Sequence, residues 1–368
     1  MKLKDILSES PFYNRVVFSS AAFLNELPEK FAVLSSDSDY LFFGSSFAAK
    51  SKSFPIVLSD NADAESVIRA TREERGLIVA VGKGKFISYC RAAAKVNGFS
   101  LVAVFTDLTF AYAFTPTVEY LFKGGLVKAD CALPEKVLID VKKLSTLKKG
   151  ALADGFAFSA SFLSSTPIQD VSFTNCVLEA VNALILVKND PFASVVKANL
   201  FAAKTAFNGS FYSDSYFVGL ILSLLSDNGE EECAFFASEY ILKLYSLIKN
   251  NDFSRILCLP DYLAPVDFLA ETTGGSAERI LSSFTPFSDE EVLLSIATIK
   301  QKIADNEVIE GLLAKLRSLK RAYSFVYNGR KKRSEVKKEQ FLKSVRLAGV
   351  YSDGVLKTLL SGGFDFFI

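Results

Sequence analysis

Residues 77–87 run Leu77-Ile78-Val79-Ala80-Val81-Gly82-Lys83-Gly84-Lys85-Phe86-Ile87, an apolar stretch that leads into two glycines and two lysines. A short, wholly apolar run is typical of a parallel strand covered on both faces. The glycines allow close backbone approach, and a helix that begins after them offers free N–H groups to an anion. The stretch therefore predicts a strand, a phosphate-binding turn and the start of a helix. A strand–turn–helix corner also needs no ligand to explain its glycines, so both interpretations stay open.

Similar apolar runs flank this stretch, and helical patterns separate several of them. The expected strands are Phe31–Leu34, Pro55–Leu58, Leu101–Phe105 and Lys136–Asp140, and the expected helices are Asp63–Arg75 and Phe86–Asn97. Strands that alternate with helices indicate a parallel sheet. The fold class is therefore α/β, with a Rossmann-like parallel-sheet domain.

From residue 148 onward, strand signals are scarce and long helical patterns follow one another. The expected helices are Cys176–Val187, Ser194–Phe207, Tyr216–Ser226, Glu231–Ile248, Asp289–Gln301, Val308–Ala322, Lys331–Leu347 and Ser352–Leu360. We predict two domains, a Rossmann-like nucleotide-binding domain over residues 1–147 and an all-helical domain over residues 148–368.

Charge and composition narrow the function classes. The 368 residues carry 42 Lys and Arg against 41 Asp and Glu, so net charge gives no argument for nucleic acid or a membrane. The longest apolar run, Phe217–Leu225, is far shorter than the ~20 residues of a membrane span, and the polar start argues against a signal peptide. Five scattered cysteines without a CxxC pair are typical of reduced thiols. We expect a cytoplasmic protein.

Histidine is absent from the chain. Its absence excludes a Ser-His-Asp triad, a Cys-His pair and any imidazole-bound metal. Acid–base chemistry would fall to Asp, Glu, Lys, Tyr or Cys.

The order of elements around the glycine turn resembles the dehydroquinate synthase-like superfamily. A helix with Ala92-Ala93-Ala94-Lys95 follows the turn, then the strand that leads to Thr106-Asp107-Leu108-Thr109, and later Pro134–Asp140 and Gly150–Asp154. The superfamily includes the iron-containing alcohol and polyol dehydrogenases, and the sequence is most similar to glycerol-1-phosphate dehydrogenase. The resemblance implies NAD(P) and a divalent metal in a cleft between the two domains.

The phosphate-binding motifs of this superfamily are altered here. Its triple-glycine turn corresponds to Gly82-Lys83-Gly84-Lys85, and the acidic residue that often follows corresponds to Ser88. Its Pro-Thr corresponds to Phe105-Thr106, and its Ser, His and Asp to Thr109, Phe110 and Ala111. The resemblance implies that Gly82, Lys83, Gly84, Lys85, Thr106 and Thr109 bind the cofactor. The two lysines would grip a phosphate, crowd the turn or simply face solvent.

The metal ligands of the superfamily are largely lost. Its metal-binding Asp corresponds to Asp154, whereas its two histidines fall near Phe217 and near Glu230–Glu232. A phenylalanine offers no lone pair, and one Asp holds a divalent cation poorly, so we expect no divalent metal. A hard cation between Asp154 and one of the glutamates is the alternative. The glutamates also suit a solvated helix N-terminus, and Asp154 suits a helix cap.

The segment 315–346 is strongly basic, with aromatic residues nearby. It suits an anionic partner or, more simply, a solvated helical face with Glu335–Lys338 and Glu339–Lys343 pairs. We therefore expect no nucleic-acid partner. The apolar tail 362–368 predicts docking on the body of the protein or on a partner, which leaves a homo-oligomer open.

Three functional hypotheses follow. The first is a diverged, catalytically impaired relative of the dehydrogenases that retains a nucleotide or another phosphate-bearing small molecule in the cleft. The second is an active NAD(P)-dependent oxidoreductase with a rebuilt carboxylate or metal-free site. The third is a non-enzymatic interaction protein.

Overall fold

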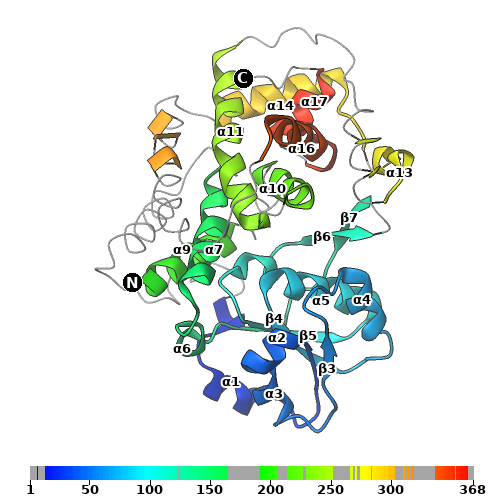
Figure 1. The fold of residues 1–368 in the computed structure, drawn as a ribbon, viewed down its shortest axis with the longest axis vertical. Helices are drawn as coiled ribbons and strands as arrows, with labels where there is room; N and C mark the ends of the chain where they lie inside the picture. Colours follow the sequence, from blue (N-terminus) through cyan, green and yellow to red (C-terminus); the bar gives the residue numbers. More distant parts are fainter. Residues whose placement is uncertain are drawn as a thin grey trace. The chain divides into compact units, whose positions relative to one another are not determined.

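A computed structural model gives the fold over most of the chain (Figure 1). It describes residues 6, 13–122, 125–164, 191–205, 214–226, 229–251, 266–267, 270–271, 274–282, 284–302, 310–311, 313–314, 316–318, 336–352 and 354–363. Contacts divide the chain into two compact units. Unit 1 comprises Met1–Phe122, Leu126–Gly155 and Phe192–Gly209, and unit 2 comprises Lys123–Gly125, Phe156–Pro191 and Ser210–Ile368. The domain boundary expected after residue 147 stays a prediction.

Unit 1 contains a six-stranded sheet in which every pair is parallel. Its strands are β1 (Val16–Val17), β2 (Ala32–Ser36), β3 (Ile56–Leu58), β4 (Leu77–Gly82), β5 (Ser100–Phe105) and β8 (Lys136–Leu138). The spatial order is β1-β8-β5-β4-β2-β3. All five predicted strands and the α/β class are confirmed.

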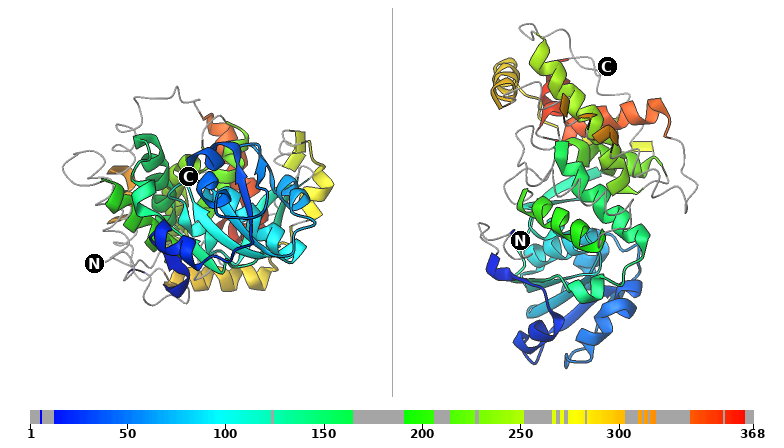
Figure 2. Two further views of the ribbon diagram at one scale, coloured as in Figure 1. Left: turned by 90° about the horizontal axis from the view of Figure 1, so that it is seen from below. Right: turned by 90° about the vertical axis from the view of Figure 1, so that its left-hand side faces the viewer.

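The central strands are mostly apolar because helices cover both faces of the sheet (Figure 1, Figure 2). On one face, α1 (Ser20–Glu26), η3 (Tyr40–Gly44) and α3 (Ser45–Ala48) place Phe23, Phe43 and Phe47 over alternate strand residues such as Val79 and Val102. Helix α5 (Gly84–Asn97) packs against β4 and β5, and α4 (Ala64–Ala70) packs against α5. The burial of both faces explains why continuous apolar runs predict these strands.

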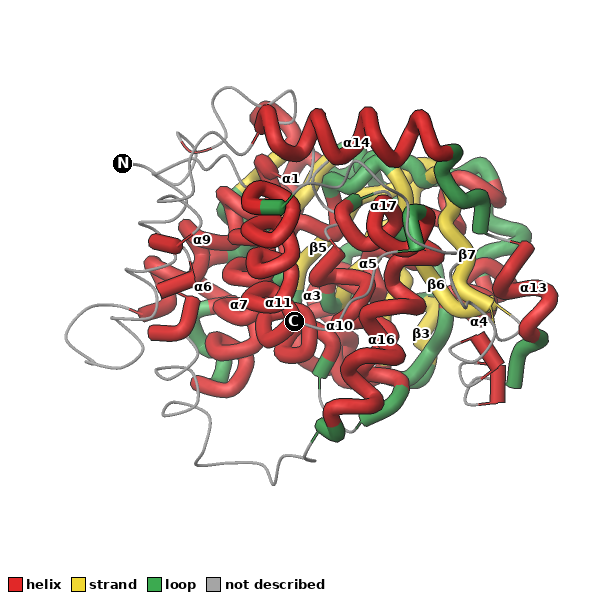
Figure 3. Tube along the Cα trace, turned by 90° about the horizontal axis from the view of Figure 1, so that it is seen from above, coloured by secondary structure: helices red, strands yellow, loops and turns green. Residues whose placement is uncertain are grey.

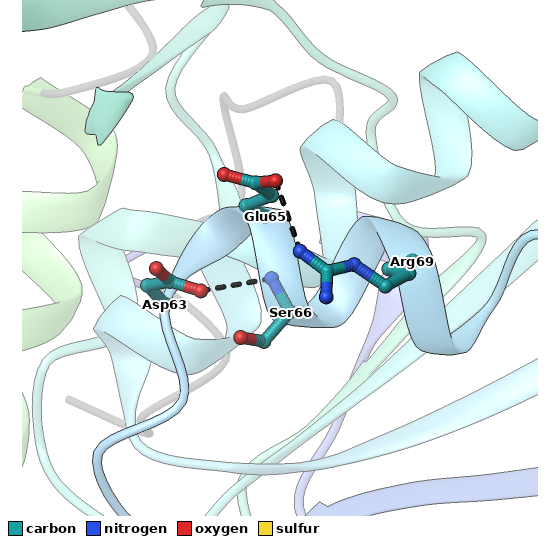
Figure 4. Close-up of polar contacts among 4 residues, drawn as sticks. All are labelled: Asp63, Glu65, Ser66 and Arg69. Carbon is teal, nitrogen blue, oxygen red and sulfur yellow. Dashed lines mark hydrogen bonds and ion pairs between the residues drawn. The ribbon is translucent and has the colours of Figure 1, made fainter. Parts of the chain in front are cut away.

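Helix α4 begins at its predicted cap but ends at Ala70, before the predicted Arg75, and α5 begins at Gly84 and ends at the predicted Asn97. Asp63 caps α4, since the Ser66 N–H donates to Asp63 Oδ1 at 2.8 Å, and Arg69 pairs with Glu65 at 3.0 Å one turn apart (Figure 4). Helix α5 ends at Gly98, whose φ of 77° lies in the left-handed region that favours glycine.

Two features differ from the sequence prediction. Strand β1 has only two residues, which is too short to give a pattern. Between Pro116 and Pro134, where no strand is predicted from the sequence, the chain forms a separate two-stranded sheet of β6 (Thr117–Phe122) and β7 (Gly125–Asp130). Thr, Glu, Lys and Asp alternate with apolar residues there, which is the period of a half-exposed strand.

The described part of unit 2 is built mainly from helices (Figure 3). Its longer helices are α10 (Asp214–Leu224), α11 (Glu230–Asn250), α14 (Asp289–Lys302), α16 (Lys338–Tyr351) and α17 (Val355–Ser361), with α13 (Ala277–Ser282) shorter. Helix α10 packs closely on α11 and α16, and α16 on α17. Helices α10, α11, α14, α16 and α17 confirm five of the predicted helices, and α9 (Pro191–Thr205), mostly in unit 1, confirms Ser194–Phe207. Cys176–Val187 and most of Val308–Ala322 lie outside the described residues. None of the described helices is long and apolar enough to cross a membrane.

Part of the basic segment is paired with acidic side chains. Lys343 contacts Glu339 at 2.8 Å on α16, which confirms the predicted pair, and Arg317 contacts Glu239 at 3.1 Å. The Glu335–Lys338 pair and the tail from residue 364 lie outside the described residues.

Candidate functional site

The glycine turn joins the end of β4 to the start of α5, as predicted. Lys83 is the extended residue before the helix, and its carbonyl accepts the first helical hydrogen bond from the Ile87 N–H at 2.9 Å. The Lys83 side chain makes no capping hydrogen bond to the helix. A helix of 14 residues therefore begins at Gly84 with its positive end at the turn, which is a favourable place for an anion.

The order of the strands places this turn at the crossover point of the sheet. From β2 the chain moves outward to β3, whereas from β4 it moves the opposite way to β5 and β8. The carboxyl ends of β2 and β4 therefore flank the point where the direction of winding reverses. In open α/β sheets, ligands bind in the crevice at this point. Ser36 ends β2 and is followed by Asp37 and Asp39, whereas Lys83 and Gly84 follow β4.

Thr106 lies next to the turn, at the carboxyl end of β5. Its N–H donates to the Gly82 carbonyl at 3.1 Å, and only 4% of the residue is exposed. Its Oγ1 makes no hydrogen bond with any described residue. A buried hydroxyl without a partner costs about 1–3 kcal/mol, so such an atom marks a place where a partner is expected.

Asp107 and Thr109 contact the first N–H group of α5. The Gly84 N–H donates to Asp107 Oδ1 at 3.2 Å and to Thr109 Oγ1 at 3.2 Å. The Thr109 hydroxyl in turn donates to Asp107 Oδ2 at 2.8 Å, and the Thr109 N–H donates to Asp107 Oδ1 at 3.2 Å. An aspartate carboxylate of the chain itself thus lies at the positive end of α5. Thr109 was predicted here, whereas Asp107 was not.

The half-buried Asp107 carboxyl has a pKa raised to about 6. Loss of hydration is the main cause, and the negative charge of the buried Asp39 adds to it. The hydrogen bonds from Thr109 and Gly84 act in the opposite direction. The carboxyl therefore changes its charge close to neutral pH, unlike an ordinary aspartate.

Other carboxylates line the same edge of the sheet. Asp39 is 6% exposed and accepts a hydrogen bond from the Ser36 hydroxyl at 3.0 Å. Asp60 accepts from the Ser38 N–H at 2.9 Å and from its hydroxyl at 2.8 Å, which lowers its pKa, with a small contribution from the charge of Lys83. Lys83 is exposed and Lys85 is half-buried. The edge therefore carries charges of both signs rather than a purely cationic surface.

Both glycines of the turn are required by the packing of the chain itself. A Cβ on Gly82 would lie 2.5 Å from Cδ1 of Phe86, and a Cβ on Gly84 would lie 2.2 Å from Thr109 Oγ1 and 2.6 Å from the Thr109 carbonyl oxygen. The ligand-free interpretation therefore explains the glycines. The case for a ligand depends instead on the helix end, the crossover point and Thr106.

The expected metal residues lie in different units. Asp154 is exposed and lies in the second turn of α7 (Lys149–Ser161) in unit 1, so it is not the cap of that helix. Phe217 is 1% exposed in the core of α10 in unit 2. The described residues contain no group of three or more His, Cys, Asp or Glu side chains that could hold a metal ion.

The glutamate run begins α11 after Gly229, as predicted for acidic residues at the positive end of a helix. The expectation that it is solvated was wrong for Glu230 and Glu232, which are 7% and 6% exposed. Three consecutive helical residues spread over about 200° of the helix surface, so at least one turns toward the protein.

No protein-family model matches the sequence, and no curated protein matches it. Solved structures match its fold. The E. coli K-12 protein YqhD gives a TM-score of 0.60 at 13% identity over 95% of this chain and 94% of its own. NADH-dependent butanol dehydrogenase A from Thermotoga maritima gives 0.52 at 15% identity, over 91% and 96% of the two chains. The iron-containing alcohol dehydrogenase from Corynebacterium glutamicum gives 0.50 at 17%, over 83% and 94%.

The protein therefore has the fold of the iron-containing alcohol dehydrogenases, with a Rossmann-like parallel sheet followed by a helical region. At these identities the likeness concerns the fold alone.

Proposed function

We propose that this chain binds a phosphate-bearing nucleotide, NAD(P), at the turn between β4 and α5. The observation that carries the proposal is the Thr106 hydroxyl, which is buried beside the turn and has no hydrogen-bond partner among the described residues. A pyrophosphate oxygen at the start of α5 would accept from this hydroxyl and from helix N–H groups. The lysines at positions 83 and 85 would supply the opposite charge.

We further propose that the chain is a diverged, catalytically impaired member of the metal- and NAD(P)-dependent polyol dehydrogenases, most similar to glycerol-1-phosphate dehydrogenase. The bound nucleotide would supply a hydride carrier. The residues present do not fit a metal centre of that superfamily, because the sequence has no histidine and Phe217 stands near one of the ligand positions. The proposal includes a cytoplasmic protein whose partner is a small molecule.

A pair of threonine variants tests the nucleotide site. Thr106→Val removes the hydroxyl with little change of shape, and NADH affinity, followed by fluorescence titration, should fall about tenfold, the equivalent of one hydrogen bond of about 1.4 kcal/mol. The stability of the ligand-free protein should stay the same or rise, because the hydroxyl has no described partner to lose. Unchanged NADH affinity would contradict the site.

Thr71→Val is the matched control. Its hydroxyl is also buried, but it donates to the Val67 carbonyl at 2.9 Å and lies on α4's C-terminal side, away from the turn. This variant should lower the free energy of unfolding by about 1 kcal/mol and leave NADH affinity unchanged.

The impaired chemistry is tested separately. The protein is incubated with NADH or NADPH, a divalent metal, and either glycerone phosphate or a simple ketone. We expect no oxidation of the nucleotide above the rate without protein. Measurable reduction would contradict the impairment and favour the rebuilt oxidoreductase.

A further inference from the structure

Asp107 holds the place at the start of α5 that the proposed nucleotide phosphate would need. Its Oδ1 accepts from the Gly84 N–H at 3.2 Å, and Thr109 fixes the carboxylate through its hydroxyl and its N–H. An anion at the positive end of a helix is stabilised by the same N–H groups that bind phosphate. The Asp107 carboxylate therefore lies where the phosphate of a bound nucleotide is expected, at the turn before α5.

A ligand site at this helix end has support that is independent of the helix. Thr106 is buried next to the turn, and its Oγ1 is without a hydrogen bond among the described residues. The Thr106 N–H donates to the Gly82 carbonyl at 3.1 Å, and Asp107 accepts from the Gly84 N–H, so both residues contact the turn from which α5 begins.

We propose that Asp107 is an internal competitor of the nucleotide: its ionised carboxylate occupies the phosphate position at the start of α5, and the nucleotide binds tightly only when that charge is removed. This inference rests on the nucleotide site proposed above. Two anions cannot share the Gly84 N–H, and a phosphate beside an ionised Asp107 is repelled across a short distance. Asp107 therefore sets the affinity of the site.

The surroundings of Asp107 make the removal of its charge possible near neutral pH. Asp39 on α2 (Asp37–Asp39) adds a negative charge. Lys83 directly precedes α5, Lys85 lies on its first turn, and Tyr112 lies on η4 (Phe110–Ala113). Burial and Asp39 favour the neutral acid, with a pKa of about 6. Nucleotide affinity should therefore rise as the pH falls through 6.

The test uses NAD⁺, because it is stable in acid and its pyrophosphate keeps its charge between pH 5 and 8. NADPH is unsuitable, since its 2′-phosphate titrates near pH 6 itself. By calorimetry, the wild-type protein should bind NAD⁺ about tenfold more tightly at pH 5 than at pH 7.5, since a like charge nearby typically shifts such equilibria by one unit or more. Asp107→Asn keeps an oxygen for the Gly84 N–H and for Thr109. It should bind about tenfold more tightly than wild type at pH 7.5, with a flat pH profile.

Asp63→Asn is the matched control. Asp63 caps α4, asparagine caps helices equally well, and the pKa of Asp63 is lowered, so it stays ionised over this pH range. Its NAD⁺ affinity and pH profile should equal those of wild type.

The outcomes separate the two proposals. If wild type binds NAD⁺ and Asp107→Asn binds it no more tightly, with no pH dependence in wild type, the competitor role is overturned and the nucleotide site stands. If neither wild type at pH 5 nor Asp107→Asn binds NAD⁺, the nucleotide site itself fails. Binding by Asp107→Asn alone at pH 7.5 supports both.

Discussion

Replacing Gly84 by alanine tests whether the turn is shaped by the chain's own packing. The new Cβ would lie 2.2 Å from Thr109 Oγ1, 2.6 Å from the Thr109 carbonyl oxygen and 2.6 Å from Cδ2 of Tyr112. One of these atoms belongs to the backbone, so the segment after β5 has to shift. Overpacking of this kind costs about 1–3 kcal/mol, and the entropy gained by replacing glycine returns about 0.4–1 kcal/mol. The net loss of unfolding free energy should be about 1.3 kcal/mol, from the middle of the two ranges.

The matched control is Gly150→Ala. Gly150 is the second residue of α7, as Gly84 is the first of α5, but no described atom outside its own helix and neighbours lies within 4 Å of its missing Cβ. This variant should be as stable as wild type or more stable by up to about 1 kcal/mol. Urea denaturation of the ligand-free proteins measures both values. If Gly84→Ala is as stable as Gly150→Ala, the packing explanation is wrong and the glycine serves a ligand alone.

Three further predictions concern buried charges. Asp107→Asn should be more stable than wild type by up to about 3 kcal/mol at pH 7 and equally stable at pH 4. The reason is that wild type, with a folded-state Asp107 pKa of about 6, loses stability as the pH rises from 4 to 6. A difference in urea midpoints that does not change with pH would contradict this. Arg91→Met should lower the free energy of unfolding by about 3–5 kcal/mol, measured by urea denaturation. The fully buried Arg91 guanidinium donates to Thr115 Oγ1 at 2.7 Å and to three backbone carbonyls, which the variant leaves without a donor. A loss under 1 kcal/mol would refute this structural role. Asp214→Ala should lower the free energy of unfolding by about 2 kcal/mol, because the carboxylate accepts from the Val355 N–H at 2.9 Å and so caps α17. Hydrogen exchange in α17 that is the same in the variant and in wild type would contradict this.

The sheet of unit 1 could be predicted because its strands are buried on both faces. Strands β2, β4 and β5 each contain a continuous apolar run, and the helix after β4 ends at a glycine with positive φ. The sheet of β6 and β7 was missed, because a half-exposed strand mixes polar and apolar residues and gives no continuous apolar run. Two-residue β1 owes its existence to its pairing with β8.

The position of the candidate site could be predicted from the sequence, but not all of its residues. The turn at Gly82–Lys85 and the residues Thr106 and Thr109 follow from local pattern and resemblance. The role of Asp107 depends on the pairing of β4 with β5, which brings residues 23 positions apart within 3.2 Å. The only local signal for Asp107 is the Asp-x-Thr spacing, because an aspartate side chain often accepts a hydrogen bond from the backbone N–H two residues later, here that of Thr109.

The central claim is that this fold retains a nucleotide at the start of α5, and calorimetric titration with NADH and NADPH tests it most directly. The titrations are run at pH 7.5 on wild type and Asp107→Asn, each with and without added Mg²⁺ or Zn²⁺. We predict micromolar binding of at least one nucleotide by Asp107→Asn that does not require the metal. No heat from either nucleotide with either protein would contradict the claim and direct the search for function to protein partners.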